Sequence, residues 1–110
     1  MISSVELEDL KGRICSLDNM SFDEIKSFTK EYKKEIETKY ELLEQREFFK
    51  KYIDAVYLNQ VQMLDAYIKK LVIENETELR FVKRILKYHL NCMLDSFIHA
   101  TVAVCHLKEE

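Results

Sequence analysis

Residues 76–107 read ETELRFVKRILKYHLNCMLDSFIHATVAVCHL, and this stretch decides the fold. It contains neither proline nor glycine, the two residues that most readily end a helix. Apolar, small and amphipathic residues recur within it at steps of three and four, which is the spacing of one helix face. They are Leu79, Val82, Leu86, His89, Met93, Ser96, Ala100, Ala103 and Leu107. The stretch therefore predicts a single long helix.

The rest of the chain favours helix for the same reason, because it has no proline and only one glycine, Gly12. Three capping boxes, each a Ser or Asn with a Glu three residues later, mark helix beginnings. They pair Ser3 with Glu6, Ser21 with Glu24, and Asn75 with Glu78. We predict a single all-α domain over 1–110, an antiparallel bundle of about four helices with a short N-terminal helix followed by long helices. The predicted helices span 4–17, 21–44, 47–73 and 76–107.

Residues 21–73 carry two different apolar patterns. The first is a narrow stripe flanked by charge, typical of a helix with most of its surface in water: Ile25, Phe28, Tyr32, Ile36, Tyr40 and Leu43. The second is a broad band: Phe49, Ile53, Val56, Tyr57, Leu64, Tyr67, Ile68 and Leu71. The segment is compatible with one continuous rod of roughly 80 Å, at 1.5 Å per residue, or with two helices broken near Glu44 to Glu47, where the patterns change. We prefer the break, with the chain folding back. The broad band predicts that the second half lies deeper in the core than the first.

Charge and cysteine usage argue against several classes of partner. The formal net charge of -3 gives no general attraction to nucleic-acid phosphates. The most apolar stretch, 92–107, is shorter than the roughly 20 residues of a membrane span, and Asp95, His99 and His106 interrupt it. Three cysteines without CxxC spacing and an acidic N-terminal segment favour reduced thiols in an intracellular protein. We therefore expect no direct nucleic-acid partner and no membrane partner.

The second half of the last predicted helix is apolar on more than one face. A helix that is apolar all round is usually buried all round, and a chain this short offers few neighbours to cover it. We therefore predict that this end binds a protein partner, either a second copy of the chain or a different subunit. The predicted interface residues are Met93, Leu94, Phe97, Ile98, Val102 and Val104.

A series of metal-ligating residue types follows the same helix at His89, Cys92, His99 and His106. Side chains seven positions apart lie about 10 Å from one another, so one helix cannot gather all four around an ion. We interpret them as part of a packing seam and expect no metal and no cofactor. The chain has no GxSxG or HExxH motif and no glycine loop for phosphate, so we predict a non-enzyme without catalytic residues.

Two segments resemble the helical domain of the Sld subunit of GINS, the four-subunit assembly that activates the replicative helicase. The first ends in Glu41-Leu42-Leu43-Glu44, which matches the Glu-Leu-Leu element after the first helix of that family. The second begins at Glu78-Leu79 and continues, in the family's order, through Lys83, Ile85-Leu86, Leu90 and Leu94. Lys39-Tyr40 replace the family's Ala-Pro, and Asn91 and Met93 replace two arginines. The resemblance implies a nuclear protein that docks other subunits through its helical domain and needs no cofactor.

Two other functional classes are compatible with the same patterns. One is a stand-alone helical adaptor or folding-cofactor-like dimer, which would be cytoplasmic and hold another protein. The other is a small intracellular inhibitor of viral or phage type, which would mask an enzyme through an acidic face that imitates nucleic-acid charge. The residues of that face would be Glu31, Glu35, Glu37, Glu41 and Glu44.

Overall fold

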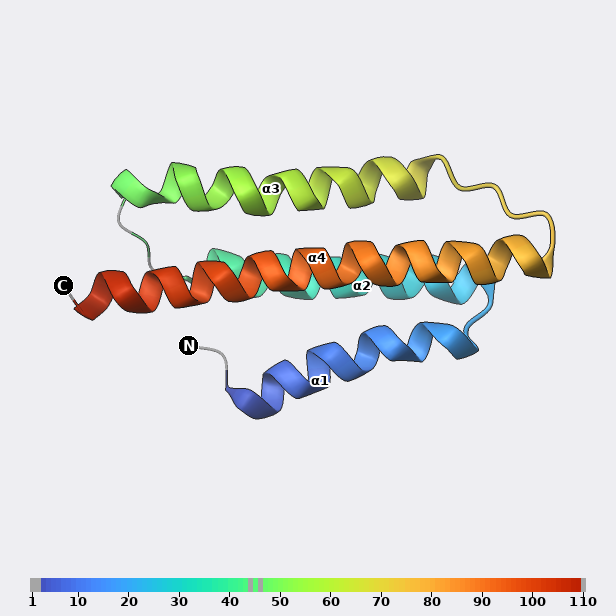
Figure 1. The fold of residues 1–110 in the computed structure, drawn as a ribbon, viewed down its shortest axis with the longest axis horizontal. Coiled ribbons are helices and arrows are strands. Elements are labelled where there is room, and N and C mark those ends of the chain that lie inside the picture. Colours follow the sequence, from blue (N-terminus) through green and yellow to red (C-terminus); the bar gives the residue numbers. More distant parts are fainter. Residues whose placement is uncertain (1–2, 44, 46, 110) are drawn as a thin grey trace.

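A computed structural model describes residues 3–43, 45 and 47–109 of the chain. Side chains are described at all of these positions except 48, 49 and 106–109. Every regular element in this part of the chain is a helix. The elements are α1 (Ser4–Cys15), the 3-10 turn η1 (Ser16–Asn19), α2 (Phe22–Glu41), α3 (Glu47–Lys69) and α4 (Glu76–Glu109). The helices reverse direction at each connection and lie alongside one another (Figure 1). The predicted all-α bundle of about four helices with a short first helix is confirmed.

Side chains cap the starts of α2 and α4 as the sequence predicts. Ser21 and Glu24 form the reciprocal capping box at the start of α2. Before α4, the Asn75 side chain accepts a hydrogen bond from the Glu78 amide at 2.9 Å. The Glu78 carboxylate accepts from the amide of Glu74 at 2.7 Å, one residue earlier than in the standard box. Both helices therefore begin where their first free amides find side-chain acceptors.

The chain reverses between Glu41 and Glu47. α2 ends before the predicted residue 44, because the Leu43 amide bonds the carbonyl of Tyr40 at 3.1 Å and tightens the last turn. The predicted break near Glu44 to Glu47 falls on this connection, although Glu44 itself lies outside the described residues.

Helices α1 and α3 also end earlier than predicted, and each ends through a tightened turn. The predicted helix 4–17 changes to the 3-10 geometry of η1 at Ser16. The predicted helix 47–73 stops at Lys69, where the amides of Lys70 and Leu71 bond carbonyls three residues back. An apolar stripe continues through both ends, so the pattern alone extends the predicted helices too far.

Helix α4 is the central element. It packs against α1, α2 and α3, and in Figure 1 it lies between α3 and α1 with α2 behind it. Among the described residues, nine of the 19 buried hydrophobic residues belong to α4 and only three to α3. The molecule measures 53 × 28 × 17 Å along its principal axes, so it is flat. In this flat arrangement α3 is covered where it meets α4 and, near Tyr57, where it meets α2.

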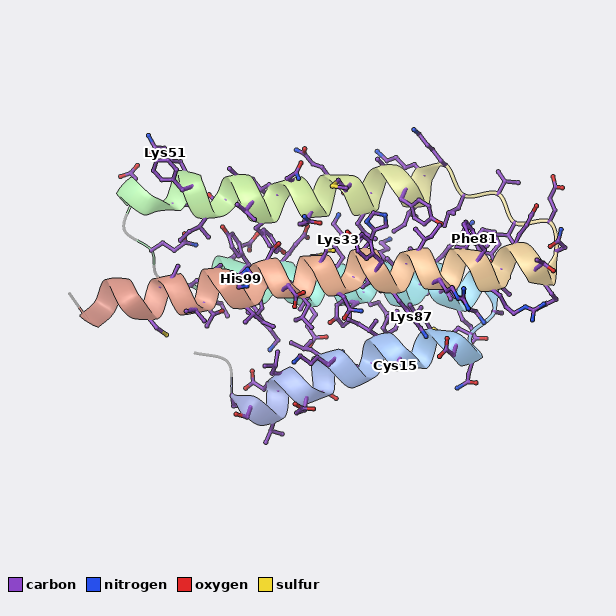
Figure 2. The ribbon with its side chains drawn as sticks, in the orientation of Figure 1. Cys15, Lys33, Lys51, Phe81, Lys87 and His99 are labelled. Atoms are coloured by element: carbon purple, nitrogen blue, oxygen red, sulfur yellow. The ribbon has the colours of Figure 1, made fainter. Side chains whose placement is uncertain are left out.

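Ion pairs tie the outer helices to one another. Arg13 of α1 donates two hydrogen bonds to the Glu35 carboxylate of α2, at 2.6 and 2.9 Å. Lys33 of α2 donates to Asp65 of α3 at 2.9 Å, and Figure 2 shows Lys33 in the region between α3 and α4. These contacts link α2 to α1 and to α3 through side chains.

Candidate functional site

The predicted interface at the end of α4 lies mostly inside the protein. Four of its six residues are at most 4% exposed and are covered by the chain's own helices: Met93, Leu94, Phe97 and Val104. Ile98 is half-buried, and only Val102 is exposed, at 50%. The premise that the chain lacks neighbours for this end of α4 is therefore wrong for four of the six. Three helices surround α4, so these four side chains need no partner to cover them.

The opposite correction applies to α3, which does not lie deeper in the core than α2. Tyr57 and Leu64 are buried, but Val56 of the same broad band is 56% exposed. Ile53, Tyr67, Ile68 and Leu71 are only half-buried, and the Phe49 side chain lies outside the described residues. Because α4 covers one side of α3, a band wider than that side continues onto the surface.

A row of uncharged residues follows the side of α3 opposite its buried residues, and the Lys51 ammonium lies 5.1 Å from the ring centroid of Tyr52 at its start. Its members recur at steps of three and four and are all exposed: Tyr52, Val56, Asn59, Met63 and Ala66. We call these five residues the α3 outer face. No charged residue occurs from 55 to 64, in a protein in which 34% of all residues are charged. Exposed apolar side chains grouped in this way are typical of surfaces that contact other proteins.

The acidic residues proposed as a nucleic-acid-like face on α2 are partly neutralised. Glu35 pairs with Arg13 at 2.6 Å. Glu37 lies 3.6 Å from the Lys33 ammonium, one turn away on the same helix. Glu44 lies outside the described residues. Over the part of α2 that the structure describes, the carboxylates therefore do not form an uninterrupted negative surface.

The His and Cys residues of α4 are spread along the helix. The His89 ring is half-buried, and its centroid lies 5.3 Å from that of Tyr67. Cys92 is half-buried and His99 is exposed, while the His106 side chain lies outside the described residues. Among the described residues, no three His, Cys, Asp or Glu side chains are placed to share a metal ion.

A pocket of about 360 Å³ opens where the C-terminal end of α2 faces the N-terminal half of α3. Carboxylates dominate its polar lining, which includes Glu37, Glu41, Asp54, Lys50, Gln45 and Tyr57. The connection between the two helices closes one end of the pocket, because Gln45 belongs to it. The sequence patterns did not predict this pocket. Their signals for it were Lys50 and Asp54, two charged residues inside the broad apolar band.

Two stacked tyrosines line the pocket. The ring centroids of Tyr40 and Tyr57 are 4.0 Å apart and their planes differ by 9°. The Tyr40 hydroxyl donates to the Asp54 carboxylate and accepts a hydrogen bond from the Gln45 side chain. The Tyr57 side chain is 1% exposed, and its hydroxyl has no hydrogen-bond partner in the described part of the chain. Burial, assisted by the negative charges of Glu37 and Glu41, raises the pKa of Tyr57, so this phenol keeps its proton.

Comparison with known proteins gives no relative: the chain matches no family profile, no curated protein and no solved structure. The residues that resemble Sld fall into two groups in the structure. Leu79, Leu86, Leu90 and Leu94 are buried along the central helix. Leu42 lies in the connection after α2 and is 77% exposed.

The helices give no indication of a membrane-spanning segment. In the described residues, none of them holds a stretch that is both long and apolar enough to cross a bilayer.

Proposed function

We propose that this protein is a non-enzymatic helical subunit that binds another protein through the α3 outer face. The observation that carries the proposal is the alignment of Tyr52, Val56 and Met63, each at least 45% exposed, on one side of one helix. Aromatic residues and methionine are enriched in the cores of protein interfaces, and charged residues are depleted there. The α3 outer face has this composition, and covering it would remove apolar surface from water.

We further propose that the assembly is of the GINS kind, which supports the replicative helicase. The support is the order of the Sld-like residues from Glu41 to Leu94 and their division between core and surface. A buried leucine series along α4 gives the domain a rigid centre, and the outer helices are then free to dock other subunits. In this assembly the protein would be intracellular and nuclear.

The experiment uses a charge placed on the α3 outer face. Val56→Lys introduces an ammonium group into the middle of the proposed interface at a side chain that is already 56% exposed. Val5→Lys is the matched control, because it makes the same change at a side chain of α1 that is 80% exposed. Each tagged full-length protein is purified from its native cells, and the co-purifying proteins are identified by mass spectrometry. Size-exclusion chromatography and circular dichroism check that both variants keep the wild-type fold.

We expect Val56→Lys to lose proteins that the wild type and Val5→Lys both retain, with helix content and melting temperature unchanged. Recovery of replication-complex subunits among the lost proteins would support the GINS-like assembly. Loss of a self-associated species alone would support the adaptor dimer instead. If all three proteins retain the same partners, the α3 outer face is not the interface.

A further inference from the structure

We infer that the pocket between α2 and α3 binds an organic cation, an ammonium or guanidinium group carried on a methylene chain. The pocket lies beside the reversal of the chain and shares none of the five residues of the α3 outer face. The inference therefore stands apart from the proposed protein interface, and either one can fail without the other.

The charge of the lining sets the sign of the ligand. Among the described residues, three carboxylates, from Glu37, Glu41 and Asp54, and one ammonium, from Lys50, line the pocket, which gives these four groups a formal charge of -2. Glu37 also lies 3.6 Å from Lys33, whose ammonium is closer to Asp65, at 2.9 Å. Glu37 and Asp54 are half-buried, so their charges act through a lower effective dielectric constant than in bulk water, whereas Glu41 and Lys50 are exposed. An entering cation would be attracted more strongly to Glu37 and Asp54 than to the same carboxylates on an open surface.

The spacing of the carboxylates favours an organic cation over a metal ion. In the part of the chain that the structure describes, no three acidic, His or Cys side chains are close enough to share one ion. A volume of about 360 Å³ is also far larger than a single dehydrated ion requires. Ammonium and guanidinium groups donate several hydrogen bonds in different directions, so they match carboxylates that are spread around a pocket.

Two buried polar atoms belong to residues that line the pocket, and a ligand would reach them once these side chains turn toward it. The Tyr57 hydroxyl and the Gln45 Oε1 atom are both buried without a hydrogen-bond partner among the described residues. Buried polar atoms are rarely left unpaired in folded proteins, because each has lost its bonds to water. Both oxygens can accept a bond from an N–H group. Leu58, which is 48% exposed, offers apolar surface to the methylene chain of the ligand.

The same chemistry has two sources, a free polyamine and the side chain of a lysine or arginine on another protein. The test therefore uses three probes: spermidine, N-acetyl-lysine methylamide and N-acetyl-arginine methylamide. N-acetyl-glutamine methylamide is the neutral control probe. Each is titrated into the full-length protein while amide shifts are followed by nuclear magnetic resonance. We expect saturable shifts confined to residues near 37–58 with at least one cationic probe and none with the neutral one.

Two variants test the residues that would hold the ligand. Glu41→Gln removes one charge and keeps the side-chain shape, and we expect about tenfold weaker binding because a hydrogen bond to a charged group is lost. Glu31→Gln is the matched control, since it makes the same change at an exposed site of α2 outside the pocket. Tyr57→Phe removes the unpartnered hydroxyl, so we expect weaker binding while the free protein keeps or gains stability.

Each result of these titrations either identifies the source of the cation or overturns the inference. Tighter binding of spermidine than of the capped amino acids would assign a free polyamine, and the reverse would assign a side chain of another protein. The inference is overturned if no cationic probe gives saturable shifts, if the neutral probe gives equal shifts, or if Glu31→Gln weakens binding as much as Glu41→Gln. Val56→Lys should bind the probes as the wild type does, so a failed interface leaves this result interpretable.

Discussion

Helix α3 and the C-terminal half of α4 are both strongly apolar in sequence, yet they occupy different environments. Phe97 in α4 is 2% exposed, whereas Val56 in α3 is 56% exposed. The difference lies in the neighbours, because α4 packs against three helices, whereas α3 packs mainly against α4 and meets α2 through side chains such as the stacked Tyr57 and Tyr40. Apolar composition therefore shows how much surface a helix can bury, and the arrangement of the other helices decides how much it does bury.

The length of α4 explains why it became the centre of the bundle. It has 34 residues, against 23 in α3 and 20 in α2. Only a helix of this length offers continuous contact to each of the others, since a helix advances about 1.5 Å per residue. The shorter helices pack around α4, and each has one side exposed to solvent.

The largest effect should come from truncating the centre of α4. Phe97→Ala removes a ring that is 2% exposed, and we expect a loss of about 3–5 kcal/mol in the free energy of unfolding, measured with urea. Phe81→Ala is the matched control, because Phe81 belongs to the same helix but is 64% exposed, near its start in Figure 2. We expect the control to change stability by no more than about 0.5 kcal/mol. Equal effects of the two substitutions would contradict the central position of α4.

A smaller effect should come from the covered side of α3. Leu64→Ala empties a fully buried site, and we expect a loss near the lower end of the roughly 2–5 kcal/mol range, because an outer helix can move inward to fill the space. Met63→Ala, at the adjacent side chain that is 45% exposed, should change stability by no more than about 0.5 kcal/mol. The same urea titration measures both. A larger loss for Met63→Ala than for Leu64→Ala would mean that the α3 outer face is covered within the protein itself.

The helices themselves were predictable because local signals specify them. Caps such as Ser21 with Glu24 act within four residues. Apolar residues spaced three and four apart indicate one face of a helix, whether or not other helices cover that face. Helix ends were less predictable, because tightened turns such as the one at Leu71 interrupt a stripe that continues in the sequence.

The candidate surfaces were not predictable from the same signals. Val56 and Phe97 both occupy apolar patterns, and nothing local indicates that only one of them meets neighbouring helices. The pocket depends on Tyr40 and Tyr57 stacking across two helices and on Gln45 in the connection. These residues come together only once the hairpin has formed, so their sequence positions carry little information about the site.

The smallest effect should come from the Arg13–Glu35 ion pair, one of two ion pairs that, among the described residues, join the outer helices α1 and α2. The hydrogen bond from Arg13 is the largest cause that lowers the pKa of Glu35 below its ordinary value of 4.5, and burial opposes it. A carboxylate with a lowered pKa in the folded state stabilises the protein above its unfolded pKa, and this contribution is lost as the pH falls through the folded pKa. The two side chains are 35% and 38% exposed, so we expect Glu35→Gln to cost at most about 1 kcal/mol at pH 7. The urea midpoints of wild type and variant should converge as the pH falls from neutral to well below the ordinary pKa of 4.5, and also at high salt, while Glu31→Gln follows the wild type throughout. A difference that grows on acidification would show that Glu35 contributes through packing of its neutral form rather than through this ion pair.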